Sequence, residues 1–271
     1  MAELCAKLIY GNGLTCGDIA SVGVAVPGTV DREKGKILFL CNLPVRDFPL
    51  AKELSAATGI GKICLENDAS AAALGEARAG STKDVSDSVL ITVGTGIGGG
   101  VILGKKLFSG SYPGGGEFGH TVIVCGGRKC ACGRRGCWEA YASVPALVRI
   151  TRRFMTKDKN SLLWEESGGK LSGADGFVPF RAASRGDASA RKAIDVYLSY
   201  LAEGLTDVVN VFRPQVLCIG GGLSGERSIL APLRRKVASG RYPGDGRETE
   251  IRLASLGNRA GIVGAAFLGE I

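Results

Sequence analysis

Three closely spaced cysteines and the single histidine of this 271-residue chain form the pattern best suited to chemistry. Cys130, Cys132 and Cys137 fall in a tight loop with glycines between them, and His120 lies ten residues before the first of them. Zinc prefers four sulfur or nitrogen ligands in a tetrahedron, and four protein ligands leave no position for a reactive water. The spacing therefore predicts a structural zinc site, with a chance cysteine cluster as the alternative.

Carboxylates near this loop and earlier in the chain are the second candidate group. Glu117 and Glu139 flank the cysteines on loops that the metal would fix, and acids of this kind can hold a polyol. Asn67 and Asp68 end the apolar run KICLE and open an alanine-rich helical stretch. One of the two suffices as a helix cap, so the pair leaves a carboxylate free to face a ligand; a purely structural cap is the alternative.

Glycine-rich turns supply backbone that can approach phosphate. Gly94, Thr95 and Gly96 lie between two apolar segments, VLITV and GIGGGVIL, which predicts a β-hairpin. Its glycines allow positive φ and expose N–H groups, which suits phosphate oxygens. The run lacks the ending of a Walker A loop, and no helix follows as in a dinucleotide fingerprint, so alone it indicates phosphate binding only weakly.

Two other glycine positions follow predicted strands. Gly220, Gly221 and Gly222 come directly after the apolar run QVLCI and offer a second backbone surface for a flat or charged ligand. Gly28 follows Pro27, which predicts a strand that ends in a turn. Gly28 either lets backbone approach a ligand or only permits the turn, and the residues alone leave both readings open.

The elements that carry these residues alternate between strands and helices, which indicates an α/β architecture. Strands are expected over 21–26, 62–67, 89–93, 97–103, 215–219 and 250–256. Helices are expected over 50–58, 69–80 and 188–212, within 146–166, and at the C-terminal end over 260–269. Leu198, Leu201 and Leu205 give the helix over 188–212 an apolar face suited to a core.

Composition excludes several classes of protein. No apolar run approaches the roughly 18–20 residues of a membrane span, and the N-terminus lacks signal-peptide character, so a cytoplasmic protein without a membrane partner is expected. The net charge is +8, but the cations are scattered; they favour solvated faces, or a local attraction for nucleotide phosphates, over a nucleic-acid partner. The isolated cysteines are predicted to be small buried hydrophobes: Cys5, Cys16, Cys41, Cys64, Cys125 and Cys218.

Taken in order, the segments GVAVPGTVD, LENDASAAALGE, ITVGTGIGGGVI, GGEFGHTVI, CACGRRGCWEAYAS and LCIGGGLS resemble the ROK family of repressors, open reading frames and kinases, in its glucokinase-like branch. The resemblance implies the two-domain actin/hexokinase-like (ribonuclease H-like) ATPase fold, with sugar and ATP between the domains. It also predicts an incomplete smaller domain, 1–87 plus 259–271, and a larger domain, 88–258, that carries the zinc loop.

The resemblance assigns a role to each candidate residue. Asp68 resembles the family's general base. The sugar would be held by Gly28, Asn67, Asp68, Glu117, His120 and Glu139. Gly94, Thr95 and Gly96 resemble the second phosphate loop, and Gly220, Gly221 and Gly222 the adenosine-side loop. His120 would also bind structural Zn²⁺ beside Cys130, Cys132 and Cys137.

These assignments predict a sugar kinase that uses ATP and Mg²⁺, with glucose as the expected hexose and a homodimer as the expected assembly. N-acetylmannosamine, fructose, another hexose, or polyphosphate in place of ATP stay open. The family's DxGGT-type first phosphate loop is missing ahead of the Pro-Gly strand, where residues 1–20 predict helix and loop. The sequence is therefore interpreted as N-terminally truncated or altered at the ATP site. Alternatives are a non-catalytic sugar-binding regulator and a zinc-stabilised structural module; a repressor with a helix-turn-helix is not expected, for lack of room.

Overall fold

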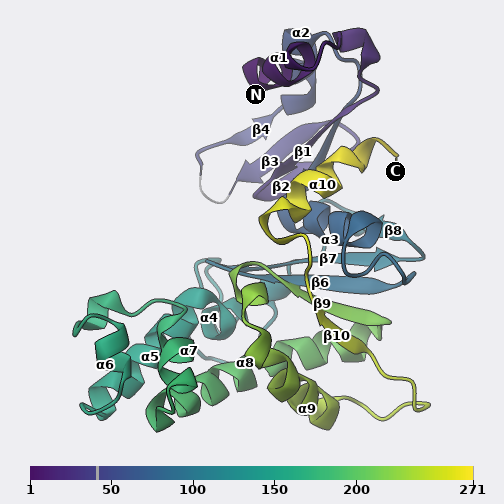
Figure 1. Cartoon of the computed structure of the whole chain (residues 1–271). Helices are drawn as coiled ribbons and strands as arrows, with labels where there is room; N and C mark the ends of the chain where they lie inside the picture. The colour runs from purple at the N-terminus through teal and green to yellow at the C-terminus, as the bar shows by residue number, and fades with distance from the viewer. Residues whose placement is uncertain (41–42, 271) are drawn as a thin grey trace. The chain divides into compact units, whose positions relative to one another are not determined.

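The computed structural model of the chain describes residues 1–40 and 43–270 and separates into two compact units (Figure 1). The first unit comprises Met1–Ile91, Gly99–Gly116 and Ala254–Ile271, and the second comprises Thr92–Gly98 and Glu117–Leu253. Both units combine strands with helices, as the predicted α/β class requires. The domain boundaries expected from the family resemblance stay a prediction.

The first unit contains a parallel strand pair and a small antiparallel sheet. Its strands and outer helices are β1 (Val22–Val26), β2 (Gly28–Asp31), β3 (Lys36–Leu40), β4 (Arg46–Phe48), β5 (Ile63–Asn67), α1 (Ala2–Gly11) and α2 (Leu50–Thr58). β1 pairs in parallel with β5, so that Val24 lies opposite Leu65, and β2, β3 and β4 are antiparallel. Side chains of β1, β2, β3 and β5 meet Leu54 of α2 in one hydrophobic core.

Gly28 does not lie in the expected turn. The strand predicted before Pro27 continues after it as β2, whose first residue is Gly28. A Cβ on Gly28 would lie 2.1 Å from the carbonyl oxygen of Phe39 in β3. The glycine is therefore required by close approach of two backbones within the sheet, and the prediction of a turn was wrong.

Helices of small residues complete the first unit. α3 (Asp68–Ala79) follows β5 directly and packs against α10 (Ala260–Ala266), near the C-terminal end of the chain (Figure 1). The side chains of α3 are buried from Ala69 to Glu76. Both helices were predicted from the sequence. The junction between β5 and α3 places Asn67 and Asp68 at the start of α3.

A five-stranded sheet has the order β10-β9-β6-β7-β8. Its strands are β6 (Ser88–Val93), β7 (Ile97–Leu103), β8 (Lys106–Phe108), β9 (Val216–Gly220) and β10 (Glu250–Leu253). β6 and β7 contribute residues to both units, whereas β9 and β10 belong to the second and pair in parallel. The predicted hairpin of β6 and β7 is confirmed by their adjacent places in this sheet.

Helices dominate the rest of the second unit: α4 (Glu139–Ala142), α5 (Val144–Lys157), α6 (Leu163–Glu166), α7 (Val178–Ser184), α8 (Ala188–Phe212) and α9 (Leu230–Gly240). α8 has the predicted bounds, and it packs against α5, α7 and α9. Its apolar face is buried, as expected, at Leu198, Leu201 and Leu205. The helical stretch expected within 146–166 is split into α5 and α6, because the chain turns between Asp158 and Leu162.

The isolated cysteines differ in exposure. Cys218 is buried in β9, but Cys125 is exposed, and Cys5, Cys16 and Cys64 are only partly buried. The prediction of buried hydrophobes was wrong for Cys125, because it lies in a surface loop without regular structure. Cys41 lies outside the described residues.

None of the helices in residues 1–40 and 43–270 combines the length and the apolar character that crossing a membrane requires.

Candidate functional site

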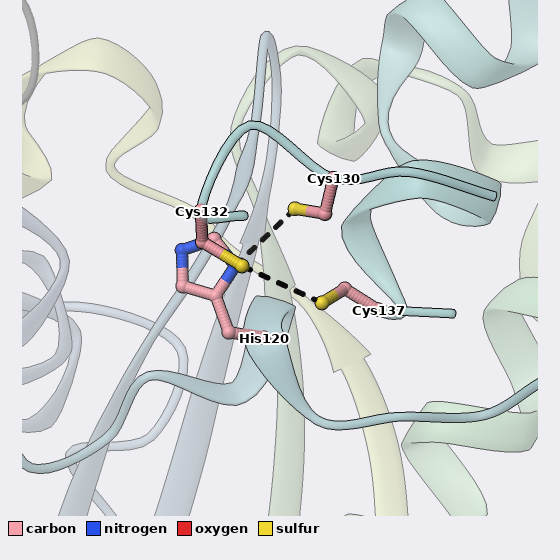
Figure 2. A group of neighbouring side chains, drawn as sticks. All are labelled: His120, Cys130, Cys132 and Cys137. Carbon is pink, nitrogen blue, oxygen red and sulfur yellow. Dashed lines mark hydrogen bonds between the residues drawn. The ribbon is translucent and has the colours of Figure 1, made fainter. Parts of the chain in front are cut away.

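His120, Cys130, Cys132 and Cys137 point toward one another (Figure 2), and their ligand atoms all lie within 4.8 Å of each other. The Sγ atoms of Cys132 and Cys137 are 3.6 Å apart, and Sγ of Cys130 is 3.7 Å from Nδ1 of His120. Ligands at about 2.3 Å (sulfur) and 2.0 Å (nitrogen) from a tetrahedral zinc ion are separated by roughly 3.5–3.8 Å. The cluster therefore has the donor atoms of a tetrahedral metal site, and the separations of 3.6 and 3.7 Å match its geometry.

The electrostatics of the thiols fit a bound cation. Cys130 and Cys137 are buried, and burial raises the pKa of both thiols, that of Cys137 to about 12. The backbone N–H of Arg134 lowers the pKa of the exposed Cys132. At neutral pH the two buried thiols are neutral unless a cation stabilises their thiolates, which is what a bound metal ion does.

Backbone contacts hold the cysteine loop on the body of the second unit. The loop closes on itself where Cys130 N donates to Arg134 O at 2.9 Å. Trp138, which is fully buried, donates from its backbone to Thr121 O at 2.8 Å and from its indole to Tyr200 O of α8 at 3.0 Å. The residue after Trp138 is Glu139, so the same contacts position that carboxylate.

Glu139 joins the cysteine loop to the turn of the hairpin. Its Oε2 accepts a hydrogen bond from Ile97 N at 3.0 Å, and its Oε1 lies 3.8 Å from Sγ of Cys130. A Cβ on Gly96 would lie 2.5 Å from Oε2. A side chain at Gly96 would therefore have to displace the carboxylate of Glu139.

Glu117 and His120 share one short turn. Glu117 directly precedes the 3-10 helix Phe118–His120, and His120 N donates to Glu117 O at 3.1 Å. Glu117 is exposed, and the ring of His120 turns Nδ1 toward Cys130, so that Nε2 is left for another partner. The second unit thus brings together Glu117, His120, Glu139 and the three cysteines.

The two glycine turns also lie together in the second unit. Gly94 N donates to Gly96 O at 3.0 Å and closes the tip of the hairpin. Gly94 and Gly96 do not adopt the positive φ that glycine allows, whereas Gly221 does, with φ of 76°. A Cβ on Gly221 would lie 2.5 Å from the carbonyl oxygen of Val93, so the Gly220–Gly222 turn contacts the strand end that leads into Gly94.

Asn67 and Asp68 have different roles in the first unit. Oδ1 of Asn67 caps α3 by accepting from Ala69 N and Ser70 N at 2.9 and 3.2 Å, and its Nδ2 donates to Gly28 O at 3.1 Å. The cap thus comes from Asn67, and Asp68 is the first residue of the helix. Asp68 Oδ1 accepts a hydrogen bond from the adjacent Ala69 N at 2.9 Å, and the residue is exposed.

The side chain of Asp68 is exposed, and its pKa is raised. Nearby protein atoms remove part of the hydration of its carboxylate, which raises its pKa, and the N–H of Ala69 offsets this only in part. A carboxylate with these two properties can take a proton from a hydroxyl group of a bound ligand.

Glu66 is a supporting residue that the sequence analysis overlooked. It is 3% exposed and accepts hydrogen bonds from Asn67 N at 2.8 Å and Ser109 Oγ at 3.3 Å. Nε of Arg32 lies 3.3 Å from its Oε2. Burial raises the pKa of Glu66 in spite of these donors. A carboxylate in the middle of the apolar strand KICLEN was the signal, since buried acids need partners.

Comparison with known proteins identifies the family. The model of the ROK family matches residues 1–270. The chain belongs to the ROK family. Glucokinase from Streptomyces coelicolor is 37% identical over 255 residues, which are 93% of this chain and 80% of that protein. The xylose repressor of Bacillus subtilis is 33% identical over 251 residues, 92% of this chain but 61% of the repressor.

Solved structures agree with this membership. A ROK family glucokinase from Streptomyces griseus, in complex with glucose and AMPPNP, superposes with a TM-score of 0.84 at 35% identity and covers 98% of this chain and 86% of that one. The predicted family and its actin/hexokinase-like ATPase fold are therefore confirmed, as is the kinship with sugar kinases.

Proposed function

We propose that this protein is a hexokinase-type kinase that transfers the γ-phosphate of ATP to a hexose, with glucose converted to glucose 6-phosphate. The observation that carries the proposal is that Asn67 and Asp68 have different roles at the start of α3. Asn67 supplies the helix cap, which leaves the carboxylate of Asp68 exposed and only partly hydrated. The glucokinase of Streptomyces coelicolor and the glucose-bound relative from Streptomyces griseus support the choice of sugar and donor.

In this proposal Asp68 accepts the proton of the sugar hydroxyl as its oxygen attacks the γ-phosphate. Phosphoryl transfer needs positioning and charge stabilisation more than covalent help, so one general base is sufficient. The raised pKa of Asp68 brings its basicity closer to neutral pH, where proton transfer is most effective.

The remaining residues would hold the two substrates. Carboxylates and amides pair well with sugar hydroxyls, because they accept and donate hydrogen bonds in fixed directions. The proposed sugar ligands are Gly28, Asn67, Asp68, Glu117, His120 and Glu139. The proposed nucleotide contacts are the hydroxyl of Thr95 and the backbone of Gly94, Thr95, Gly96, Gly220, Gly221 and Gly222. Mg²⁺ would neutralise charge on the phosphates.

A structural zinc ion, held by His120, Cys130, Cys132 and Cys137, is also part of the proposal. It would fix the loop that carries Glu139 and the turn that carries Glu117. A homodimer and the domain boundaries 1–87 plus 259–271 and 88–258 are proposed on the family resemblance alone, and a cytoplasmic location is proposed from the sequence.

A coupled assay of ADP release, run with Mg-ATP and a panel of hexoses, tests the function. We expect glucose to give the highest kcat/KM, and N-acetylmannosamine and fructose lower values. A protein that binds glucose in calorimetry but releases no ADP with any hexose contradicts the kinase proposal.

A non-catalytic sugar-binding regulator is the second candidate, because the xylose repressor of Bacillus subtilis is 33% identical to the chain. The two candidates differ in one result of the same assay. A regulator binds a pentose or hexose, and the bound sugar raises the melting temperature, but ATP is not consumed.

A further inference from the structure

A basic hollow in the second unit lies beside the proposed phosphate turn. Its volume is about 440 Å³, and Thr95 lines it at the tip of the hairpin. Arg128 and Lys129 line it from the cysteine loop, and Arg149 from α5. A second hollow of about 620 Å³ shares Thr95 and Arg149 with the first and adds Arg152. Four cationic side chains therefore line two adjoining hollows, and Thr95 lines both hollows.

Arg149 is the most constrained of these cations. Its Nη2 donates to Ala140 O at 2.5 Å, while its Nε is buried and finds no partner among the described residues. Burial lowers the pKa of Arg149, and the nearby charge of Arg128 lowers it further. A buried donor without an acceptor costs free energy, as does the repulsion between two guanidinium groups.

No protein carboxylate offsets this cost. Within residues 1–40 and 43–270, Arg128, Lys129 and Arg149 form no ion pair. Glu139 is the acid that lines the smaller hollow, and its Oε2 accepts from Ile97 N at 3.0 Å. A ligand with several negative charges and many acceptor oxygens would satisfy the guanidinium groups, since arginine forks match phosphate oxygens.

We propose that the hollow lined by Thr95, Arg128, Lys129 and Arg149 binds a linear chain of phosphate groups, the part shared by a nucleoside triphosphate and inorganic polyphosphate. This inference rests on the proposed function, because it extends the donor site from the turn at Thr95 toward the cysteine loop and α5. Arg152, at the edge of the adjoining hollow, would meet a longer chain.

Calorimetric titration of the full-length, metal-loaded protein with sodium tripolyphosphate, at fixed ionic strength and without Mg²⁺, tests the inference. Arg128→Gln and Arg149→Gln should each weaken binding at least about tenfold, because each removes a charge-assisted contact. Arg153→Gln is the matched control, since Arg153 is exposed on the same helix and lines neither hollow. Arg128 is also exposed, so Arg128→Gln should leave the melting temperature unchanged even if Arg149→Gln does not.

Competition with ATP distinguishes the two sources of phosphate. Displacement of tripolyphosphate by ATP supports a site for the nucleotide's own phosphates, and simultaneous binding supports a separate site for polyphosphate. Failure of tripolyphosphate to bind, or equal binding by the wild-type protein and both variants, overturns the inference. The heat of binding does not depend on turnover, so loss of the kinase proposal would leave this result intact. If ATP displaces tripolyphosphate, turnover with an unchanged KM for ATP in both variants would overturn the inference and leave the kinase proposal standing.

Discussion

Asp68 sets the expected pH dependence of the reaction. Nearby protein atoms remove part of the hydration of its carboxylate, which raises its pKa above the ordinary value of about 3.9 for an aspartic acid, and the base works only when it is deprotonated. We expect kcat/KM to be constant near neutral pH and to fall as the pH drops through this raised pKa, with a midpoint above the ordinary aspartate value. An acidic limb centred at or below the ordinary aspartate value, in protein that circular dichroism shows to be folded, would contradict the assignment.

Glu139 is expected to act on the sugar and not on the fold. In Glu139→Gln the remaining side-chain oxygen can still accept from Ile97 N, but the carboxylate charge is lost. We expect KM for glucose to rise about tenfold, since a hydrogen bond to a charged group contributes roughly 1.5–3 kcal/mol. The melting temperature should hardly change. Glu203→Gln, on the exposed side of α8, is the control, and an equal KM in both variants would contradict this role.

For single residues, the sequence identifies the important positions more reliably than it identifies the role of each one. The Asn-Asp doublet pointed to a cap and a spare carboxylate, but only the structure assigns the cap to Asn67. Gly96 allows positive φ, but in the structure it lies beside the carboxylate of Glu139, 43 positions later, and a side chain there would have to displace that carboxylate. Such long-range contacts leave no trace in local spacing.

The cysteine loop should depend on its metal for stability. We expect about one equivalent of zinc in protein purified without chelator, and a melting temperature several degrees lower after its removal, because the loop loses its four-ligand tie. Cys132→Ser should have the same effect. Cys125→Ser is the matched control, since Cys125 is an exposed thiol in the same region but outside the cluster. Less than about half an equivalent of zinc would count against the site.

Glu76 ties α3 to the segment that precedes α10. It is fully buried and accepts hydrogen bonds from Ser81 N at 2.6 Å, Leu256 N at 2.8 Å and Ser255 N at 3.0 Å. Burial acts to raise the pKa of Glu76, but these N–H donors together lower it. The stabilisation is therefore complete above the unfolded pKa of about 4.3 and is lost as the pH falls through the lower folded value.

Glu76→Gln should consequently reduce the free energy of unfolding by about 2 kcal/mol at pH 7, because hydrogen bonds to a charged acceptor are lost. Urea denaturation at several pH values measures this, and the difference from wild type should shrink as the solution becomes acidic. Glu53→Gln, at an exposed position of α2, is the control. A difference that grows toward low pH would contradict the claim that ionised Glu76 stabilises the folded protein.

Elements with strong local signals were predictable and the others were not. α2 ends at Gly59, with φ of 74°, and α8 follows its apolar periodicity. The strands β2, β3, β4 and β8 and the helices α4, α7 and α9 were missed. β4 and β8 have three residues each, and β4 is exposed along its length, so neither carries a pattern that could be read without its partner strands.

For the whole chain, the order of the motifs was more informative than any one of them. The glycine run at Gly94 alone indicated little, but its place between the Asn-Asp doublet and the cysteine loop matched the ROK family, which the comparisons confirm. Composition had excluded classes of protein without pointing to a sugar kinase. The basic hollow at Arg149 could not be foreseen, because its cations come from a loop and a helix that only the fold brings together.

The most direct test compares turnover and sugar binding in wild-type protein and Asp68→Asn. The variant keeps the size and shape of the side chain but removes the base, so kcat should fall by about 10²- to 10⁴-fold in the ADP-release assay. The dissociation constant for glucose, measured by calorimetry, should stay within a few-fold of wild type. Full turnover by Asp68→Asn would contradict the proposed mechanism, and so would a wild-type protein that binds glucose and never releases ADP.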